Sequence, residues 1–142
     1  MTDFQAALGL SQLTKLDKFL IKRNRLAKEY MKNLRNLPLK TQKIEKSDYS
    51  SYHLFVVNLN LKKIDKSYKQ IYLFLNKYKI AVNKHYPCVH LQPFYRSLGF
   101  RPKMYPNSEN YEKCALSLPI STKMNFSDVR LVSKILKKAI TK

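Results

Sequence analysis

The segment from Asn83 to Tyr95 gathers most of the side chains in this sequence that could bind a polar ligand. It reads NKHYPCVHLQPFY and contains five candidates, His85, Tyr86, His90, Gln92 and Tyr95. Imidazole, phenol and amide groups donate and accept hydrogen bonds, so they suit a ligand rich in hydroxyl and amide groups. Spacing alone leaves a second interpretation open, because histidine and tyrosine side chains also occur as partly buried residues that cap a small core.

Two prolines shape this segment. Pro87 and Pro93 prevent it from continuing as a strand or entering the interior of a helix. The apolar residues Ile80–Val82 before it predict a strand over 80–85, from whose end His85 and Tyr86 would emerge. Binding residues are common in loops that a buried element holds in place. We therefore expect this loop to bind a polar ligand without performing chemistry alone.

Other catalytic and metal-binding patterns do not occur. Gly9 and Gly99 are the two glycines, so there is no glycine-rich phosphate loop. Cys88 and Cys114 have neither the spacing of a zinc site nor that of a disulfide framework, which favours a reduced, cytoplasmic setting. A nucleophilic pair of Cys88 with a neighbouring histidine is the alternative to consider. Cys88 lacks a recognisable orienting acid and a helix N-terminus to lower its pKa, which argues against this pair.

The net charge of +19 raises the possibility of nucleic-acid binding. However, 22 of the 28 basic residues are lysine, and they are scattered along the chain. Direct reading of bases favours arginine, on one concentrated surface. Nucleic acid is therefore not the partner we expect, although a lysine-rich nucleic-acid binder and a stand-alone interaction domain remain alternatives.

Length and hydropathy indicate one folded domain. With 142 residues and 44% hydrophobic residues, the chain can bury a core. No apolar stretch is long enough to span a membrane, and the N-terminal residues lack the pattern of a secretory signal. We therefore expect no membrane partner.

The periodicity predicts a small α+β fold. A capping box at Thr2 starts an amphipathic helix that runs to about Leu37, where Pro38 ends it, and a polar loop over 39–51 follows. The remaining predicted elements are a strand over 52–61, a helix through Lys79 capped by Asp65 or Ser67, the strand over 80–85, a short helix over 92–98 with Pro93 in its first turn and Gly99 at its end, a helix over 109–115 capped by Asn107 or Ser108, an extended piece over 116–120, and a final helix capped by Asn125 or Ser127. These form a three-stranded, mostly antiparallel sheet with helices on one side.

The first helix is longer than this small domain needs. At 1.5 Å per residue it would span about 50 Å. Its first turns, over 4–10, carry no charge, whereas lysines follow from Lys15 onward. We expect this uncharged face to dock on a large domain or to promote self-association of the chain.

Four motifs resemble one protein family. They are the opening MTDFQAALGLSQL, the strand SYHLFVV, the loop HYPCVHLQPFY and the segment CALSLPI. Together they resemble the C-terminal portion of the DegT/StrS family of pyridoxal-phosphate-dependent nucleotide-sugar aminotransferases. Within the family, the motifs are most similar to transaminases that make UDP-4-amino-4,6-dideoxy-N-acetyl-β-L-altrosamine in the pseudaminic acid pathway.

The resemblance implies a domain organisation and a reaction. Residues 1–37 would be the long linking helix and 38–142 the small C-terminal domain of a fold-type I aminotransferase. The large domain, with the lysine and phosphate ligands that hold pyridoxal phosphate, would precede Met1. The complete enzyme would be a homodimer that uses glutamate to aminate a 4-keto UDP-sugar, for bacterial surface or flagellar sugars. The isolated chain would be inactive.

The resemblance also implies roles for single residues. His85, Tyr86, His90 and Gln92 match the family's H-Y-x-x-x-H-x-Q loop, which faces the sugar nucleotide, and Tyr95 is a further candidate. His53 would lie near the site or pack in the core, as a lone histidine on a strand often does. No catalytic, cofactor-binding or metal-binding residue is expected in this chain.

Overall fold

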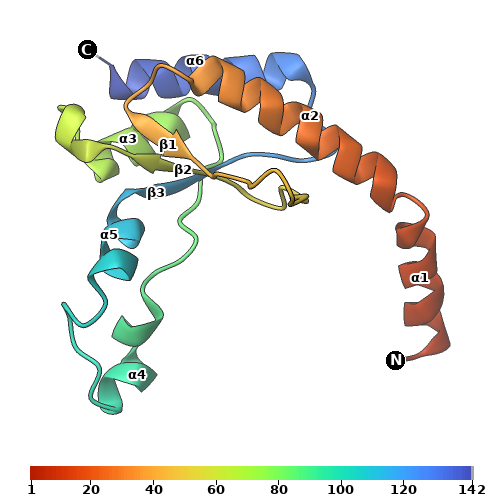
Figure 1. Ribbon diagram of the computed structural model, residues 1–142, viewed down its shortest axis with the longest axis horizontal. Coiled ribbons are helices and arrows are strands. Elements are labelled where there is room, and N and C mark those ends of the chain that lie inside the picture. Colours follow the sequence, from red (N-terminus) through yellow and green to blue (C-terminus); the bar gives the residue numbers. More distant parts are fainter. Residues whose placement is uncertain (142) are drawn as a thin grey trace.

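The computed structural model describes residues 1–141 and shows an arch-shaped molecule (Figure 1). Its helices and strands follow the order α1 (Asp3–Leu13), α2 (Leu16–Leu34), β1 (Leu39–Thr41), β2 (Phe55–Leu59), α3 (Tyr68–Lys77), α4 (Pro93–Ser97), α5 (Pro106–Cys114), β3 (Ala115–Leu118) and α6 (Phe126–Ile140), with short 3-10 helices at Leu61–Lys63 and Val89–Leu91. The sheet, α2, α3 and α6 form the body, from which α1 projects at one end and α4 at the other.

The three strands form an antiparallel sheet in the order β1-β2-β3. Phe55 pairs with Leu118, Val56 with Ser117, and Asn58 with Ala115. Burial alternates along β2, where Phe55, Val57 and Leu59 are buried and the residues between them are half-buried. Successive side chains of a strand point to opposite faces. One face of the sheet therefore belongs to the core, and the other is partly open.

The core lies between the sheet and three helices. Helices α2 and α6 pack against each other, α3 packs against α6, and all three cover the same face of the sheet (Figure 1). Tyr30 of α2 is fully buried, and its ring stacks on Phe55 with centroids 4.7 Å apart. Its hydroxyl group donates a hydrogen bond of 2.8 Å to the carbonyl of Pro119. This side chain thus ties the first half of the chain to the segment that follows β3.

Most predictions that rest on local chemistry are confirmed. The fold is α+β with three strands, and all the pairing is antiparallel. Thr2 caps α1 through the predicted capping box, and of the two candidates for each later helix, Ser67 caps α3 and Asn125 caps α6. Pro93 occupies the first turn of α4, and Gly99 follows this helix with a φ of 95°, a conformation that suits glycine.

The prediction of one long helix up to Leu37 was wrong. The chain is helical over two segments, with a turn at Thr14 and Lys15, and α2 ends at Leu34. The hydroxyl group of Thr14 donates to the carbonyl of Ser11 over 2.9 Å, and the N–H of Lys15 bonds Gln12 three residues before it. Side-chain bonds of this kind compete with the regular helical pattern. The helix therefore changes direction after its uncharged turns.

The strand assignments also need correction. Strand β1, Leu39–Thr41, lies inside the segment predicted as a polar loop. The segment 80–85, predicted as a strand, contributes only an isolated bridge between Asn83 and Ser117. The strand predicted over 52–61 is limited to Phe55–Leu59. Helix α5 begins at Pro106, and neither Asn107 nor Ser108 caps it.

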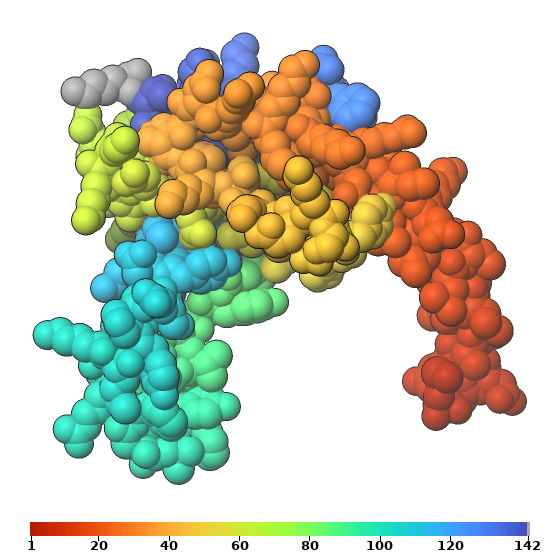
Figure 2. Space-filling view, viewed as in Figure 1, coloured from red at the N-terminus to blue at the C-terminus, as the bar shows by residue number. Residues whose placement is uncertain are grey.

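Helix α1 has no buried residue. Phe4, Leu8, Leu10 and Leu13 expose more than half of their surface. Figure 2 shows α1 and the segment around α4 as two arms with open space between them. The docking of this apolar surface on a large domain, or on a second copy of the chain, stays a prediction. Within residues 1–141, no helix combines the length and apolar character needed to cross a membrane.

We predict that Tyr30→Phe destabilises the domain by about 1 kcal/mol, because the Pro119 carbonyl loses its donor while the ring contact with Phe55 remains. Urea unfolding monitored by circular dichroism measures this difference. Tyr49→Phe is the matched control, since Tyr49 is 67% exposed and should leave stability unchanged. Equal unfolding midpoints for wild type and Tyr30→Phe would show that this hydrogen bond contributes nothing.

Candidate functional site

The face of the sheet away from α2, α3 and α6 carries the best-defined group of polar side chains. Ser117 pairs with Val56, and residues paired across antiparallel strands place their side chains on the same face. Since Phe55 and Leu118 point into the core, Ser117 and Val56 belong to the opposite face. We call this the open face of the sheet.

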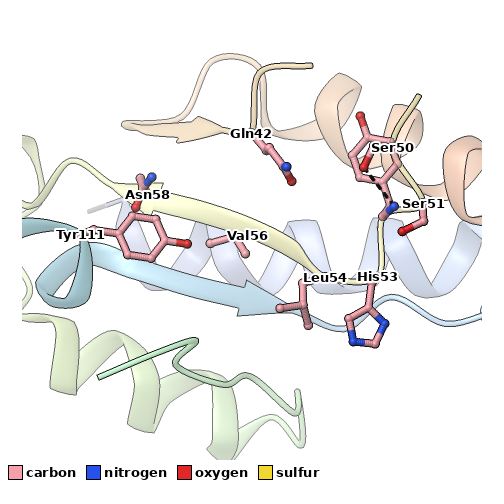
Figure 3. Close-up of a pocket in the computed structure, with 9 residues that line it drawn as sticks. Gln42, Ser50, Ser51, His53, Leu54, Val56, Asn58 and Tyr111 are labelled. Atoms are coloured by element: carbon pink, nitrogen blue, oxygen red, sulfur yellow. Dashed lines mark hydrogen bonds between the residues drawn. The ribbon is translucent and has the colours of Figure 1, made fainter. Parts of the chain in front are cut away.

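A shallow pocket of about 440 Å³ lies on the open face (Figure 3). Most of its lining residues have polar side chains, and they come from four segments: Gln42, the stretch from Ser50 to Leu54, the β2 residues Val56 and Asn58, and Tyr111 of α5. His53 and Tyr111 lie at opposite ends of the pocket in Figure 3. Hydroxyl, amide and imidazole groups on one surface provide both donors and acceptors for a polar ligand.

Arg23 of α2 holds the pocket rim at His53. Its guanidinium group donates to the carbonyls of Tyr52, His53 and Ile120 over 2.9, 3.2 and 3.3 Å. The Tyr52 ring is buried beside Phe55, whereas the next side chain, His53, is exposed at the pocket. Of the two positions expected for His53, near the site or packed in the core, the structure excludes the core.

His85 lies against the open face of the sheet. Its Nδ1 atom is 2.8 Å from Ser117 Oγ, and its Nε2 atom is 3.5 Å from the Asn83 side-chain nitrogen. Two backbone hydrogen bonds between Asn83 and Ser117, of 3.2 and 2.9 Å, fix the same segment to β3. The Tyr86 and His85 rings form a T-shaped pair with centroids 4.8 Å apart, and Tyr86 is 65% exposed. This pair is therefore attached to the core through β3 and still accessible to a ligand.

His90 is buried, and contacts with Glu109 and Tyr105 fix its ring. Its Nε2 atom is 3.2 Å from Glu109 Oε1, and its ring contacts the Tyr105 ring at 4.9 Å. The N–H of Lys103 donates to the same carboxylate oxygen over 2.7 Å. Burial raises the pKa of Glu109, but hydrogen bonds from His90 and Lys103 outweigh this effect and leave the pKa below its usual value. One carboxylate thus connects three segments around α4.

The other predicted binding residues lie away from the open face. Tyr86, His90 and Tyr95 line a second, shallow hollow of about 430 Å³ beside α4. Gln92 is exposed as the N-cap residue of α4, makes no capping bond through its side chain, and lines neither cavity. The structure thus separates the predicted residues into His85 on the sheet and a group around α4, with Tyr86 between them. Their binding role stays a prediction.

Cys88 has the environment of a structural thiol. It is buried, and its N–H donates to Glu112 Oε2 over 3.0 Å. Burial and the neighbouring Glu112 raise the pKa of this thiol. A protonated, buried thiol is a poor nucleophile, which agrees with the expectation that Cys88 performs no catalysis. Among residues 1–141, no group of three histidine, cysteine or acidic residues could hold a metal ion.

Ser117, Gln42 and Tyr111 are site residues that sequence reasoning missed. The motif CALSLPI contains the signal for Ser117, because in an extended segment Ser117 must point away from Leu116 and Leu118. No local signal identifies Gln42 or Tyr111, since pairing of distant segments brings them to the pocket.

A model of the DegT/DnrJ/EryC1/StrS aminotransferase family matches residues 1–137, which is almost the whole chain. The chain belongs to this family. The resemblance inferred from the four motifs is therefore confirmed. The fold is similar to that of the putative sugar aminotransferase Spr1654 from Streptococcus pneumoniae in its PMP form, with a TM-score of 0.88, at 26% identity over 98% of this chain and 35% of that one.

Two curated family members show the same extent of similarity. The spore coat polysaccharide biosynthesis protein SpsC of Bacillus subtilis is 33% identical over 91% of this chain and 34% of its own length. The UDP-4-amino-4,6-dideoxy-N-acetyl-beta-L-altrosamine transaminase of Campylobacter jejuni is 32% identical over 96% of this chain and 36% of its own length. The chain thus spans about a third of the length of the relatives it matches.

Pyridoxal phosphate, the cofactor of this family, would need a free lysine, and the lysine beside the predicted loop is not free. Lys84 is the lysine nearest the predicted loop, and its ammonium group is 3.5 Å from Glu112 and lies over the Tyr68 ring at 5.2 Å. Both contacts direct it to neighbours within the fold, and it lines neither cavity. Lys84 is therefore not placed to hold the cofactor at the site described here.

We predict that Glu112 makes stability depend on pH in the acid range. The hydrogen bond from Cys88, followed by the charge of Lys84, holds the pKa of Glu112 below its usual value of 4.5. A carboxyl group with a lowered pKa stabilises the fold above its unfolded-state pKa, and this contribution is lost as the pH falls through the folded-state pKa. Glu112→Gln should cost roughly 1 kcal/mol at neutral pH and make the acid decline shallower.

Urea unfolding at a series of pH values measures both effects. Glu45→Gln is the matched control, because the Glu45 carboxylate pairs with Lys43 on an exposed loop and should affect neither quantity. An acid decline in Glu112→Gln as steep as in the wild type would contradict the assignment.

Proposed function

We propose that this chain forms the small domain of a pyridoxal-phosphate-dependent aminotransferase that transfers an amino group from glutamate to a 4-keto nucleotide sugar. The observation that carries this proposal is the contact of His85 with Ser117, on the face of the sheet that also carries the pocket, in a member of the DegT/DnrJ/EryC1/StrS family. The name of the Campylobacter jejuni relative supports a UDP-linked amino sugar as the product.

The residues of this chain would bind and orient the sugar. His85 and the polar side chains of the open face offer donors and acceptors to sugar hydroxyl and N-acetyl groups. The exposed Tyr86 ring would cover one face of the sugar, and His90, Gln92 and Tyr95 would contribute from the segment around α4. Pyridoxal phosphate, when bound in the large domain, supplies the chemistry of amino-group transfer.

The apolar surface of α1 supports pairing with a large domain. Four large apolar side chains of this helix are more than half exposed, which is costly for a helix that stays in water. We propose that α1 links to or packs on the cofactor-binding domain, and that the complete enzyme is a cytoplasmic homodimer. Nucleic-acid binding is not favoured, because the family match and the polar pocket account for the site without it.

We predict that the isolated chain neither binds pyridoxal phosphate stoichiometrically nor transfers amino groups, because Lys84 is engaged by Glu112 and Tyr68. Absorbance after gel filtration with the cofactor, followed by borohydride reduction and mass spectrometry, measures the binding. A relative of full length serves as the positive control. Stoichiometric modification of a single lysine in this chain would refute the assignment of cofactor binding to the large domain.

We predict that Tyr86→Ala, made in a complete enzyme containing this segment, raises KM for the nucleotide sugar about tenfold, which corresponds to about 1.4 kcal/mol of binding. The reaction with glutamate alone should keep its rate, since Tyr86 would contact only the sugar. Tyr78→Ala is the matched control, because Tyr78 is a similarly exposed tyrosine beside α3. An unchanged KM in Tyr86→Ala would remove Tyr86 from the sugar site.

A further inference from the structure

The orientation of the Asn83 amide is fixed by the backbone. The N–H of Lys84 donates a hydrogen bond of 2.8 Å to Asn83 Oδ1. Since a backbone N–H is only a donor, the oxygen of this amide must face it, and the NH₂ group must lie on the other side. That NH₂ group is the one that faces His85 Nε2 at 3.5 Å. The group that faces His85 Nε2 is therefore a hydrogen-bond donor, the NH₂ group of Asn83.

This arrangement determines which nitrogen of a neutral His85 carries the proton. A neutral imidazole has one N–H and one lone pair. With an amide donor facing Nε2, this atom accepts, and the proton resides on Nδ1, from which it is donated to Ser117 Oγ over 2.8 Å. The opposite tautomer would place two donors against each other at Nε2. All three contacts of the network are satisfied only when Nδ1 is protonated.

The partners of His85 are held rigidly. Ser117 is 5% exposed, and its strand is buried along its full length. Asn83 and Ser117 exchange two backbone hydrogen bonds, which fix the backbone at both positions, and the bond from the Lys84 N–H holds the Asn83 amide. Ser117 Oγ is therefore a hydrogen-bond acceptor in a fixed position for the Nδ1 proton. The contact at Nε2 is long and lies at the accessible side of the ring, so a stronger donor can replace it.

We propose that Asn83 and Ser117 are positioning residues that hold neutral His85 with its proton on Nδ1, so that Nε2 offers a lone pair to a hydrogen-bond donor of the ligand. The ligand group recognised is thus a hydroxyl or an amide N–H, and not a carbonyl or phosphate oxygen. The identification of this group as part of a nucleotide sugar rests on the proposed function. The tautomer itself is a property of this chain alone.

Nitrogen-15 NMR of the histidine rings in the isolated chain tests this proposal at a pH where His85 is neutral. We expect Nε2 to resonate at the downfield position of an unprotonated nitrogen and Nδ1 at the upfield position of a protonated one. In Asn83→Asp a carboxylate oxygen faces Nε2, so the proton should move to Nε2. In Ser117→Ala the Nδ1 acceptor is lost, so the difference between the two shifts should shrink.

Two controls separate positioning from a general loss of structure. Ser133→Ala removes a buried hydroxyl group that has no hydrogen-bond partner within residues 1–141, and it should leave the His85 shifts unchanged. Ser117→Thr keeps a hydroxyl group and should restore the wild-type tautomer. A wild-type ring with its proton on Nε2, or shifts that Asn83→Asp and Ser117→Ala both leave unaltered, would overturn the proposal. Because no ligand is present, this outcome is independent of whether the complete enzyme aminates a sugar.

Discussion

The candidate site depends on the burial of one short strand, β3. Leu116 and Leu118 fix this strand in the core, while Ser117 between them points to the open face and contacts His85. One edge of β3 pairs with β2, and Asn83 bonds the other edge. A loop containing two prolines would have little structure of its own, so its geometry derives from this strand. The packing of Leu116 and Leu118 in the core thus fixes the position of Ser117 and, through it, of His85.

The one-sided sheet explains the shape of the molecule. Helices α2, α3 and α6 occupy one face, and the other face is left to the polar pocket and to two projecting arms (Figures 1 and 2). A complete small globular domain seldom leaves such apolar surfaces as α1 uncovered. The shape agrees with a chain that spans about a third of the length of its relatives and contributes one wall of a site.

Sequence reasoning succeeded where the determinants are local. Capping involves residues three apart, so the sequence identified Thr2 as the cap of α1 and reduced the caps of α3 and α6 to two candidates each. It failed for β1 because a three-residue strand with a central lysine has no readable periodicity and exists only through pairing with β2. The site was found in part. The loop was visible in its residue types, but the contact of His90 with Glu109 and that of His85 with Ser117 join segments 19 and 32 residues apart.

We propose that β3 holds His85 over the open face, where it would contact the sugar of a nucleotide substrate. A crystal structure of a complete enzyme containing this segment, with its cofactor and a bound nucleotide sugar, tests this claim most directly. The account predicts a sugar hydroxyl or amide nitrogen within about 3.2 Å of His85 Nε2, with Ser117 still in contact with Nδ1. A sugar bound without contact to His85, with another domain covering the open face, would contradict it.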